Sequence, residues 1–135
     1  MLTEPAIKED FRSEKVREVF TRSFFELTNH WELSRQEEAR LLGWDYDEKR
    51  TTIDSLRKGK TIISKDLDKI ERMIDLINIH KSLRILFPYD RDVVYAWVKI
   101  KRDRFGGYSA LDVMLEDGKE GISAIRHYLD YERTR

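Results

Sequence analysis

Two adjacent glycines, Gly106 and Gly107, restrict how this chain folds more than any other feature of its sequence. They lie within residues 97–118, where most of the other residues favour a helix. Two glycines in a helix interior would cost roughly 1 kcal/mol each relative to alanine. Glycine is instead well suited to a position where the backbone needs a positive φ or a close approach. We therefore predict a shaped, architectural corner at Gly106 and Gly107.

The residues on both sides of this corner carry apolar side chains at helical spacing. The pattern predicts a helix over residues 91–101 before the corner, and a short helix that begins at Ser109 and ends at Gly118 after it. Gly118 and Gly121 are expected to bracket a further turn. A last helix over about residues 120–132 completes the chain.

The N-terminal part contains a loose arm followed by a helix. Residues 1–9 show little periodicity, whereas residues 10–28 place apolar side chains on one helical face. Three phenylalanines on this face, Phe20, Phe24 and Phe25, need a deep apolar surface to pack against. We expect the helix to pack into the core, with a dimer interface as the alternative.

A helix start is visible at Ser34, because Glu37 three residues later completes the pattern of a capping box. This helix should end at Gly43, and a second helix is expected over about residues 48–58. Two short helices joined by a tight turn fit a helix-turn-helix unit. The second helix would then contact DNA through side chains that bond phosphates and base edges: Lys49, Arg50, Thr51, Thr52, Ser55, Arg57 and Lys58.

The charge of this region gives only limited support to DNA binding. Residues 47–60 contain five basic and three acidic side chains, a surplus of two positive charges. Over the whole chain, 26 Lys and Arg balance 26 Asp and Glu, so no overall field attracts nucleic acid. An ordinary helical hairpin with a solvated face is the alternative interpretation.

A long helix is predicted over residues 64–87, ended by Pro88. Its two apolar stripes indicate burial on two sides, so we expect it to join the N-terminal and C-terminal parts of the chain. His80 lies within it, and His30 and His127 are equally isolated in the sequence. No His, Asp and Glu spacing assembles a set of metal ligands, so no metal site and no cofactor are expected.

Length and composition set further bounds. At 135 residues the chain is expected to be one compact domain or two small lobes that share a core. It has no cysteine, no apolar run near 18 residues and no secretory leader pattern at its start. These features predict a cytoplasmic protein without a membrane partner.

The combined pattern resembles the Xre/MbcA/ParS family of bacterial antitoxins over residues 31–133. The segments LSRQEEARLLGWD, residues 33–45, and TTIDSLRKGK, residues 51–60, resemble the helix-turn-helix of that family. The most specific match is AWVKIKRDRFGGYSALDVMLEDGKEGISAIRHYL, residues 96–129, which is similar to its toxin-binding domain. Many members carry Pro-Asn before the Phe-Gly-Gly, where this chain has Arg-Asp-Arg at 102–104.

This resemblance implies an all-α fold with four parts. Residues 1–30 form an N-terminal arm and helix, 31–63 an Xre-like helix-turn-helix, 64–88 a linking helix and 89–135 a small toxin-binding lobe. The first thirty residues have no counterpart in the family pattern.

The resemblance also implies a function. Such antitoxins pair with RES-domain toxins, which deplete cellular NAD, and neutralise them by covering the active-site cleft. They can also bind the promoter of their own operon, and a homodimer or a hetero-oligomer with the toxin is expected. The residues that we expect to meet the toxin lie near the C-terminus, where arginine and tyrosine suit an interface: Arg126, Tyr131, Glu132, Arg133 and Arg135.

The same residues are compatible with other interpretations of the C-terminus and of the function. The polar C-terminus could simply be a frayed end. The chain could also be a stand-alone DNA-binding regulator without a toxin. An enzyme is the least favoured class, because Phe105-Gly-Gly-Tyr lacks the spacing of a phosphate loop and no nucleophile sits with a base.

Overall fold

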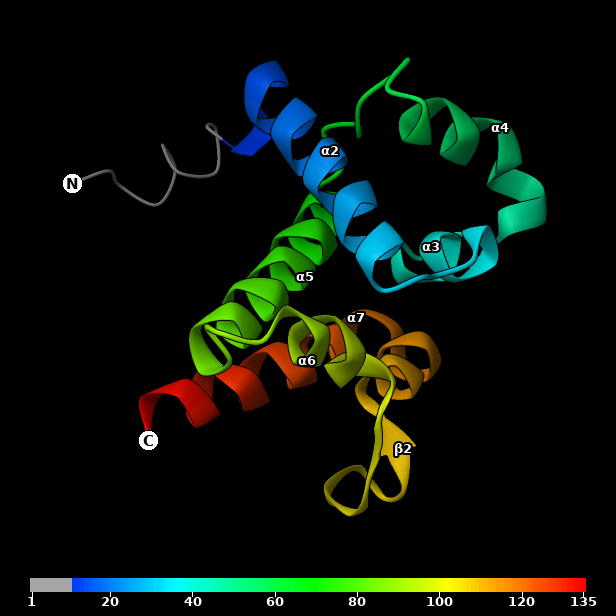
Figure 1. Ribbon diagram of the computed structural model, residues 1–135. Coiled ribbons are helices and arrows are strands. Elements are labelled where there is room, and N and C mark those ends of the chain that lie inside the picture. The colour runs from blue at the N-terminus through cyan, green and yellow to red at the C-terminus, as the bar shows by residue number, and fades with distance from the viewer. Residues whose placement is uncertain (1–10) are drawn as a thin grey trace.

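The computed structural model describes residues 11–135, which are mostly helical (Figure 1). The loose arm predicted for residues 1–9 lies outside the described residues. The elements are, in chain order, α2 (Glu14–His30), α3 (Arg35–Leu41), α4 (Tyr46–Arg57), α5 (Leu67–Leu86), α6 (Arg91–Ala96), a 3₁₀ turn (Trp97–Lys99), β1 (Lys101–Arg102), a second 3₁₀ turn (Asp103–Phe105), β2 (Tyr108–Ser109) and α7 (Ala110–Thr134).

Helix α2 packs into the core, as its phenylalanines predict. Ser13 caps its first turn by accepting a hydrogen bond from the backbone N–H of Val16. Phe24 and Phe25 are buried and meet edge to face, with ring centroids 4.9 Å apart. The dimer interface stays an untested alternative, for which α2 offers the exposed Val19.

The short helices α3 and α4 start and stop at the local signals. The predicted capping box is confirmed, because Ser34 and Glu37 each accept a hydrogen bond from the other's backbone N–H. Gly43 has a φ of +78° and ends α3. Helix α4 begins at Tyr46, two residues before the prediction, because the carboxylate of Asp45 caps it by accepting from the Glu48 N–H.

Helix α5 lies at the centre and packs against α2 and α7, as expected for a helix with two apolar stripes. It starts at Leu67 rather than at residue 64, because Asp66 rather than Ser64 provides its cap. At 20 residues it is shorter than α7, which spans 25.

The Gly106 and Gly107 corner is confirmed, and so is the helix expected to begin at Ser109, which caps α7. The helix predicted over residues 91–101 is too long, because α6 ends at Ala96 and is followed by a 3₁₀ turn and β1. Both glycines have positive φ, +66° and +88°. They close a small hairpin in which the Gly107 N–H donates to the Arg102 carbonyl at 2.8 Å. The chain turns back on itself over residues 103–107, so the two residues on each side of this loop pair as antiparallel strands β1 and β2 before α7 begins. The all-α prediction is corrected to this extent.

The turn predicted between Gly118 and Gly121 is a bend within α7. Gly118 has a φ of +63° and a ψ of −135°, which breaks the helical path. Gly121 is helical and buried, and a Cβ at this position would collide with the backbone carbonyl of Val113. It therefore allows the two halves of α7 to approach each other rather than making a turn.

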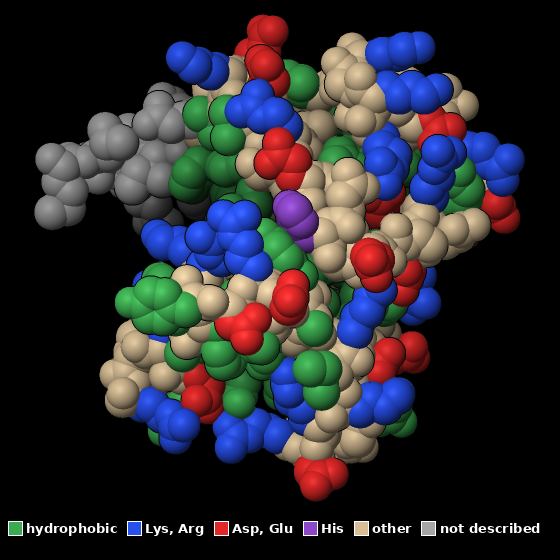
Figure 2. Space-filling model, in the orientation of Figure 1, with side chains coloured by type: hydrophobic (Ala, Val, Ile, Leu, Met, Phe, Trp, Pro, Cys, Tyr) green, Lys and Arg blue, Asp and Glu red, His purple; other side chains and the backbone are tan. Residues whose placement is uncertain are grey.

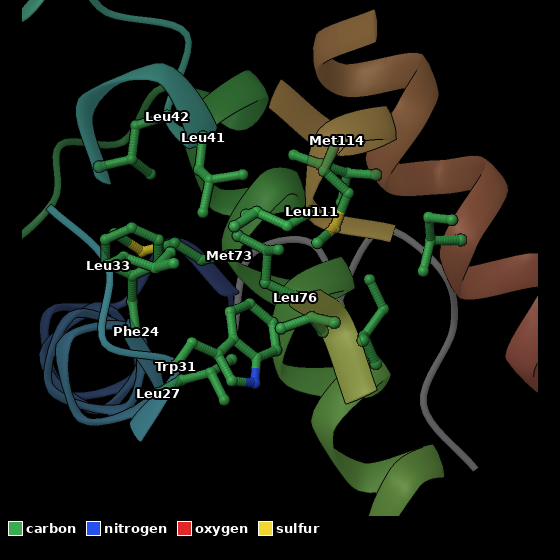
Figure 3. Packing of buried hydrophobic residues seen from close by; sticks show 14 of the residues in the cluster. Phe24, Leu27, Trp31, Leu33, Leu41, Leu42, Met73, Leu76, Leu111 and Met114 are labelled. Carbon is green, nitrogen blue, oxygen red and sulfur yellow. The ribbon is translucent and has the colours of Figure 1, made fainter. Parts of the chain in front are cut away.

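One core joins all these elements. Figure 3 shows Phe24 of α2, Leu41 of α3, Met73 of α5 and Met114 of α7 converging on a shared interior. Hence the N-terminal helices and the C-terminal lobe are packed on a common cluster. Within residues 11–135, no helix is both long and apolar enough to span a bilayer.

Candidate functional site

Two predicted DNA-binding cations at the start of α4 are held by aromatic rings of their own chain. The ammonium of Lys49 lies 5.8 Å from the ring centroid of Trp44, and the Arg50 guanidinium lies 5.1 Å from that of Tyr46. Arg50 also pairs with Asp47 at 3.3 Å. Lys49 and Arg50 are nevertheless exposed and could exchange these contacts for a ligand.

Arg57 has turned inward and does not lie on the outer face of α4. Its Nε donates to Glu38 at 3.2 Å, and its Nη2 donates to the side-chain oxygen of Asn29 at 2.9 Å. Glu38 is fully buried and also accepts from the Thr28 hydroxyl. Burial raises the pKa of the Glu38 carboxyl. Arg57 is therefore the counterion of a buried carboxylate and ties α4 to α2 and α3.

The predicted hydroxyl residues come together in a shallow groove. Thr51, Thr52 and Ser55 line a hollow of about 450 Å³, together with Thr61 and Ser64 from the segment after α4. The last two were missed by the sequence reasoning, because they lie beyond the helix. Hydroxyl groups of this kind can donate to or accept from a polar ligand.

The charges around this groove are mixed. Lys58 is exposed and forms no ion pair with any side chain of residues 11–135. The first turn of α4, however, carries Asp47 and Glu48, and Asp45 caps it. Carboxylates at a helix start are favourable for the helix but would repel a nearby phosphate.

In the C-terminal lobe, three aromatic rings hold the hairpin against α7. Trp97, Phe105 and Tyr128 pack with ring centroids 5.3 to 6.4 Å apart. The Arg102 guanidinium lies 4.4 Å from the Trp97 ring centroid and donates to its backbone carbonyl at 3.1 Å. The cluster fixes the hairpin at a defined position on the helix.

Arg104, at the hairpin tip, fastens the hairpin to the end of α7. Its Nη1 donates to the Tyr128 hydroxyl at 2.7 Å and to the Glu132 carboxylate at 2.9 Å. Arg102 and Arg104 belong to the Arg-Asp-Arg segment that precedes Phe105 and the two glycines. Both arginines therefore fold back on their own chain.

Three of the five predicted toxin-binding residues contact another element of this chain. Glu132 is bound by Arg104, as described. Arg126 pairs with Asp75 of α5 at 2.6 Å, and Arg133 donates to the Ser82 hydroxyl at 3.2 Å. Each contact fastens α7 to the hairpin or to α5.

The other two predicted residues face solvent. Tyr131 is 65% exposed, and Arg135 is exposed while its Nε lies 3.1 Å from the Glu132 carboxylate. Helix α7 continues to Thr134, so both residues lie in or directly after its last turn. Arg133 is exposed as well, so Tyr131, Arg133 and Arg135 are the members of the predicted set that a partner can reach directly.

A stack of three rings that the sequence did not reveal joins α2, α5 and α6. His30 and His80 each stack on Tyr95, with centroid distances of 4.2 and 5.6 Å and planes within 8°. The Nε2 of His80 is buried, with no hydrogen-bond partner among the described residues. Burial lowers the pKa of His80, helped by the nearby charges of Arg84 and His30.

The His80 environment predicts a loss of stability in mild acid. Its folded pKa lies below the ordinary 6.5, so the unfolded chain binds more protons as the pH falls below that value. We expect the urea midpoint to be highest above pH 6.5 and to fall towards pH 5. His80→Phe should reduce this slope, whereas the exposed His127→Gln should retain it. An equal slope in the wild type and His80→Phe would contradict the prediction.

Comparison with known proteins places the chain in a family. No family model matches it. It is 35% identical to the uncharacterized protein y4oB of Sinorhizobium fredii over 112 residues, which span 82% of this chain and 81% of that protein. The chain belongs to the y4oB family. A match of this length must include both the α3–α4 region and the hairpin. The similarity to y4oB therefore covers most of the helical body described above.

The candidate residues of this y4oB family member, all of which the structure describes, show no metal-binding arrangement. Within residues 11–135, no group of three or more His, Asp or Glu side chains is arranged to hold a metal ion. The candidate residues instead gather in two places, the outer face of α4 and the end of α7 with its hairpin.

Proposed function

We propose that the protein is the antitoxin of a type II toxin–antitoxin pair and that its partner is a RES-domain toxin. The proposal rests on the resemblance of residues 31–133 to the Xre/MbcA/ParS antitoxins. The observation that supports it most is that the motif residues of the C-terminal segment have a common structural task.

That task is to shape the hairpin and the bent helix. Trp97 packs in the aromatic cluster, and Gly106 and Gly107 supply the positive φ angles of the hairpin. Ser109 and Asp112 form a reciprocal capping box at the start of α7, and Gly118 bends it. A motif whose members build a surface is expected for a protein that acts by contact.

The end of α7 provides a means of blocking a cleft. Tyrosine and arginine are the residues most often found at energetic centres of protein interfaces. Glu132 is bound by Arg104 and pairs with Arg135, so it limits the directions in which the terminal guanidinium projects. A helical end loses little backbone freedom on binding, which favours affinity. Steric cover of the toxin's active site follows from such docking.

The proposal can be tested with exposed residues alone. Tyr131→Ala combined with Arg135→Ala should abolish rescue of cells that express the product of the adjacent open reading frame, with the melting temperature unchanged. The exposed Lys60→Ala serves as the control and should rescue like the wild type. Truncation after Leu129 is a less clean test, because it also removes the Arg133–Ser82 and Arg104–Glu132 bonds. Undiminished rescue by the double variant would refute this site.

Promoter binding through α4 is the weaker candidate. Its support is the hydroxyl-lined groove beside Lys49. Arg57 is engaged inside the molecule, and Asp47 and Glu48 lie at the start of the helix. With zero net charge, a single copy would bind phosphates weakly, and DNA affinity would need several copies in one assembly.

A further inference from the structure

The second half of α7 runs parallel to α5, and this brings two distant segments to one end of the molecule. Three side-chain contacts show how the two helices are aligned: Lys119 with Glu71, Arg126 with Asp75 and Arg133 with Ser82. The residue numbers in these contacts increase in the same direction along both helices, as they do for parallel helices. The C-terminus of α7 therefore lies beside the C-terminus of α5, as Figure 1 shows at its lower left.

The end of α5 and the segment after it present unusually exposed side chains. Tyr89 is 99% exposed and Ile85 is 49% exposed. Arg84 is also exposed, and it pairs with no acidic side chain of residues 11–135. Figure 2 shows Lys and Arg side chains gathered beside a large exposed hydrophobic one, close to where Figure 1 places α5. Large apolar side chains left in water at one end of a small protein indicate an interaction site.

We propose that the toxin-binding surface extends from α7 onto the end of α5. This end surface consists of Arg84, Ile85, Tyr89, Tyr131, Arg133 and Arg135. It rests on the proposed antitoxin function and adds α5 residues that the family motif does not include. The complementary partner is a protein surface with carboxylates beside an apolar depression, because exposed guanidinium groups here accompany exposed tyrosine and isoleucine.

The neighbouring charges favour a protein partner over nucleic acid. Asp90 and Asp92 are exposed directly after Tyr89, and Asp130 and Glu132 flank Tyr131. A phosphate backbone would meet these carboxylates, whereas a protein surface can place its own cations or hydrogen-bond donors opposite them. Exposed isoleucine adds nothing to phosphate binding but contributes to a desolvated protein interface.

The experiment measures binding of the full-length protein to the purified product of the adjacent open reading frame by titration calorimetry. We expect Tyr89→Ala and Arg84→Glu each to weaken binding at least tenfold, with unchanged melting temperatures. Arg84→Lys, which keeps the charge, should lose less binding affinity than Arg84→Glu. Lys60→Glu, a matched charge reversal after α4, should stay within twofold of the wild type.

The outcomes separate this inference from the function on which it rests. If the wild type binds and Tyr131→Ala weakens binding, while Tyr89→Ala and Arg84→Glu bind like the wild type, the extension onto α5 is wrong and the antitoxin proposal stands. If the wild type fails to bind, both fail. If the α5 variants weaken only the binding of a DNA duplex, the end surface is a nucleic-acid site and the inference is overturned.

Discussion

Replacing Arg57 with alanine should lower the free energy of unfolding by about 3 kcal/mol, since removal of one partner from a buried ion pair leaves the other charge uncompensated. Glu38 has no exposed surface, and after the change only Thr28 would bond its carboxylate. Urea denaturation at pH 7.5 measures the effect. The exposed Arg50→Ala is the matched control and should change stability by about 0.5 kcal/mol or less.

The same variant should be less impaired in acid. Burial already raises the pKa of Glu38, and loss of the arginine raises it further. Because the folded pKa then exceeds the unfolded one, the folded variant binds more protons and loses stability as the pH rises above about 4.3. The gap between variant and wild type should therefore narrow from pH 7.5 towards pH 4.5. A gap that is constant over this range would show that the lost packing of Arg57 matters more than its charge.

Gly121→Val should destabilise the protein by about 3 kcal/mol, because it forces extra volume into a packed contact. A Cβ at this position would lie 2.9 Å from the Cβ of Asp117 and would also collide with the Val113 carbonyl. The two halves of α7 would have to separate, which also disturbs the Gly118 bend. Thermal unfolding followed by circular dichroism measures the loss.

Ala124→Val provides the control for the Gly121 variant. Ala124 lies three residues further along α7 and is exposed, so valine there costs only its lower helix propensity, about 0.6 kcal/mol. If both variants lost the same stability, the close approach at Gly121 would not be what requires glycine.

Helix ends were predictable where a few neighbouring residues determine them. Ser34 and Glu37 form their capping box within one turn, and Gly43 ends its helix through its own φ angle. The hairpin was missed because its strands are defined by pairing, with Lys101 opposite Ser109. The apolar pattern at the end of the helix predicted over residues 91–101 arises because Trp97 and Val98 are buried in a 3₁₀ turn.

The candidate sites were predictable by residue type but not by environment. Arginine is a residue type that often contacts DNA, yet Arg57 binds Glu38, which lies 19 residues away in the sequence. The stack of His30, Tyr95 and His80 unites three helices, so no local pattern reveals it. The same holds for Arg104, whose partners follow it by 24 and 28 residues.

The continuous core has a consequence for how the protein would be cleared from a cell. Because the same buried cluster includes residues of α2 and α7, opening one end exposes the packing surface of the other. If the proposed function holds, a partner bound at the tip of α7 would lower the population of open forms throughout the core, and more so as its free concentration rises above its Kd. Proteolysis of α4, far from the contact, would slow while the complex persists and resume when the partner is lost.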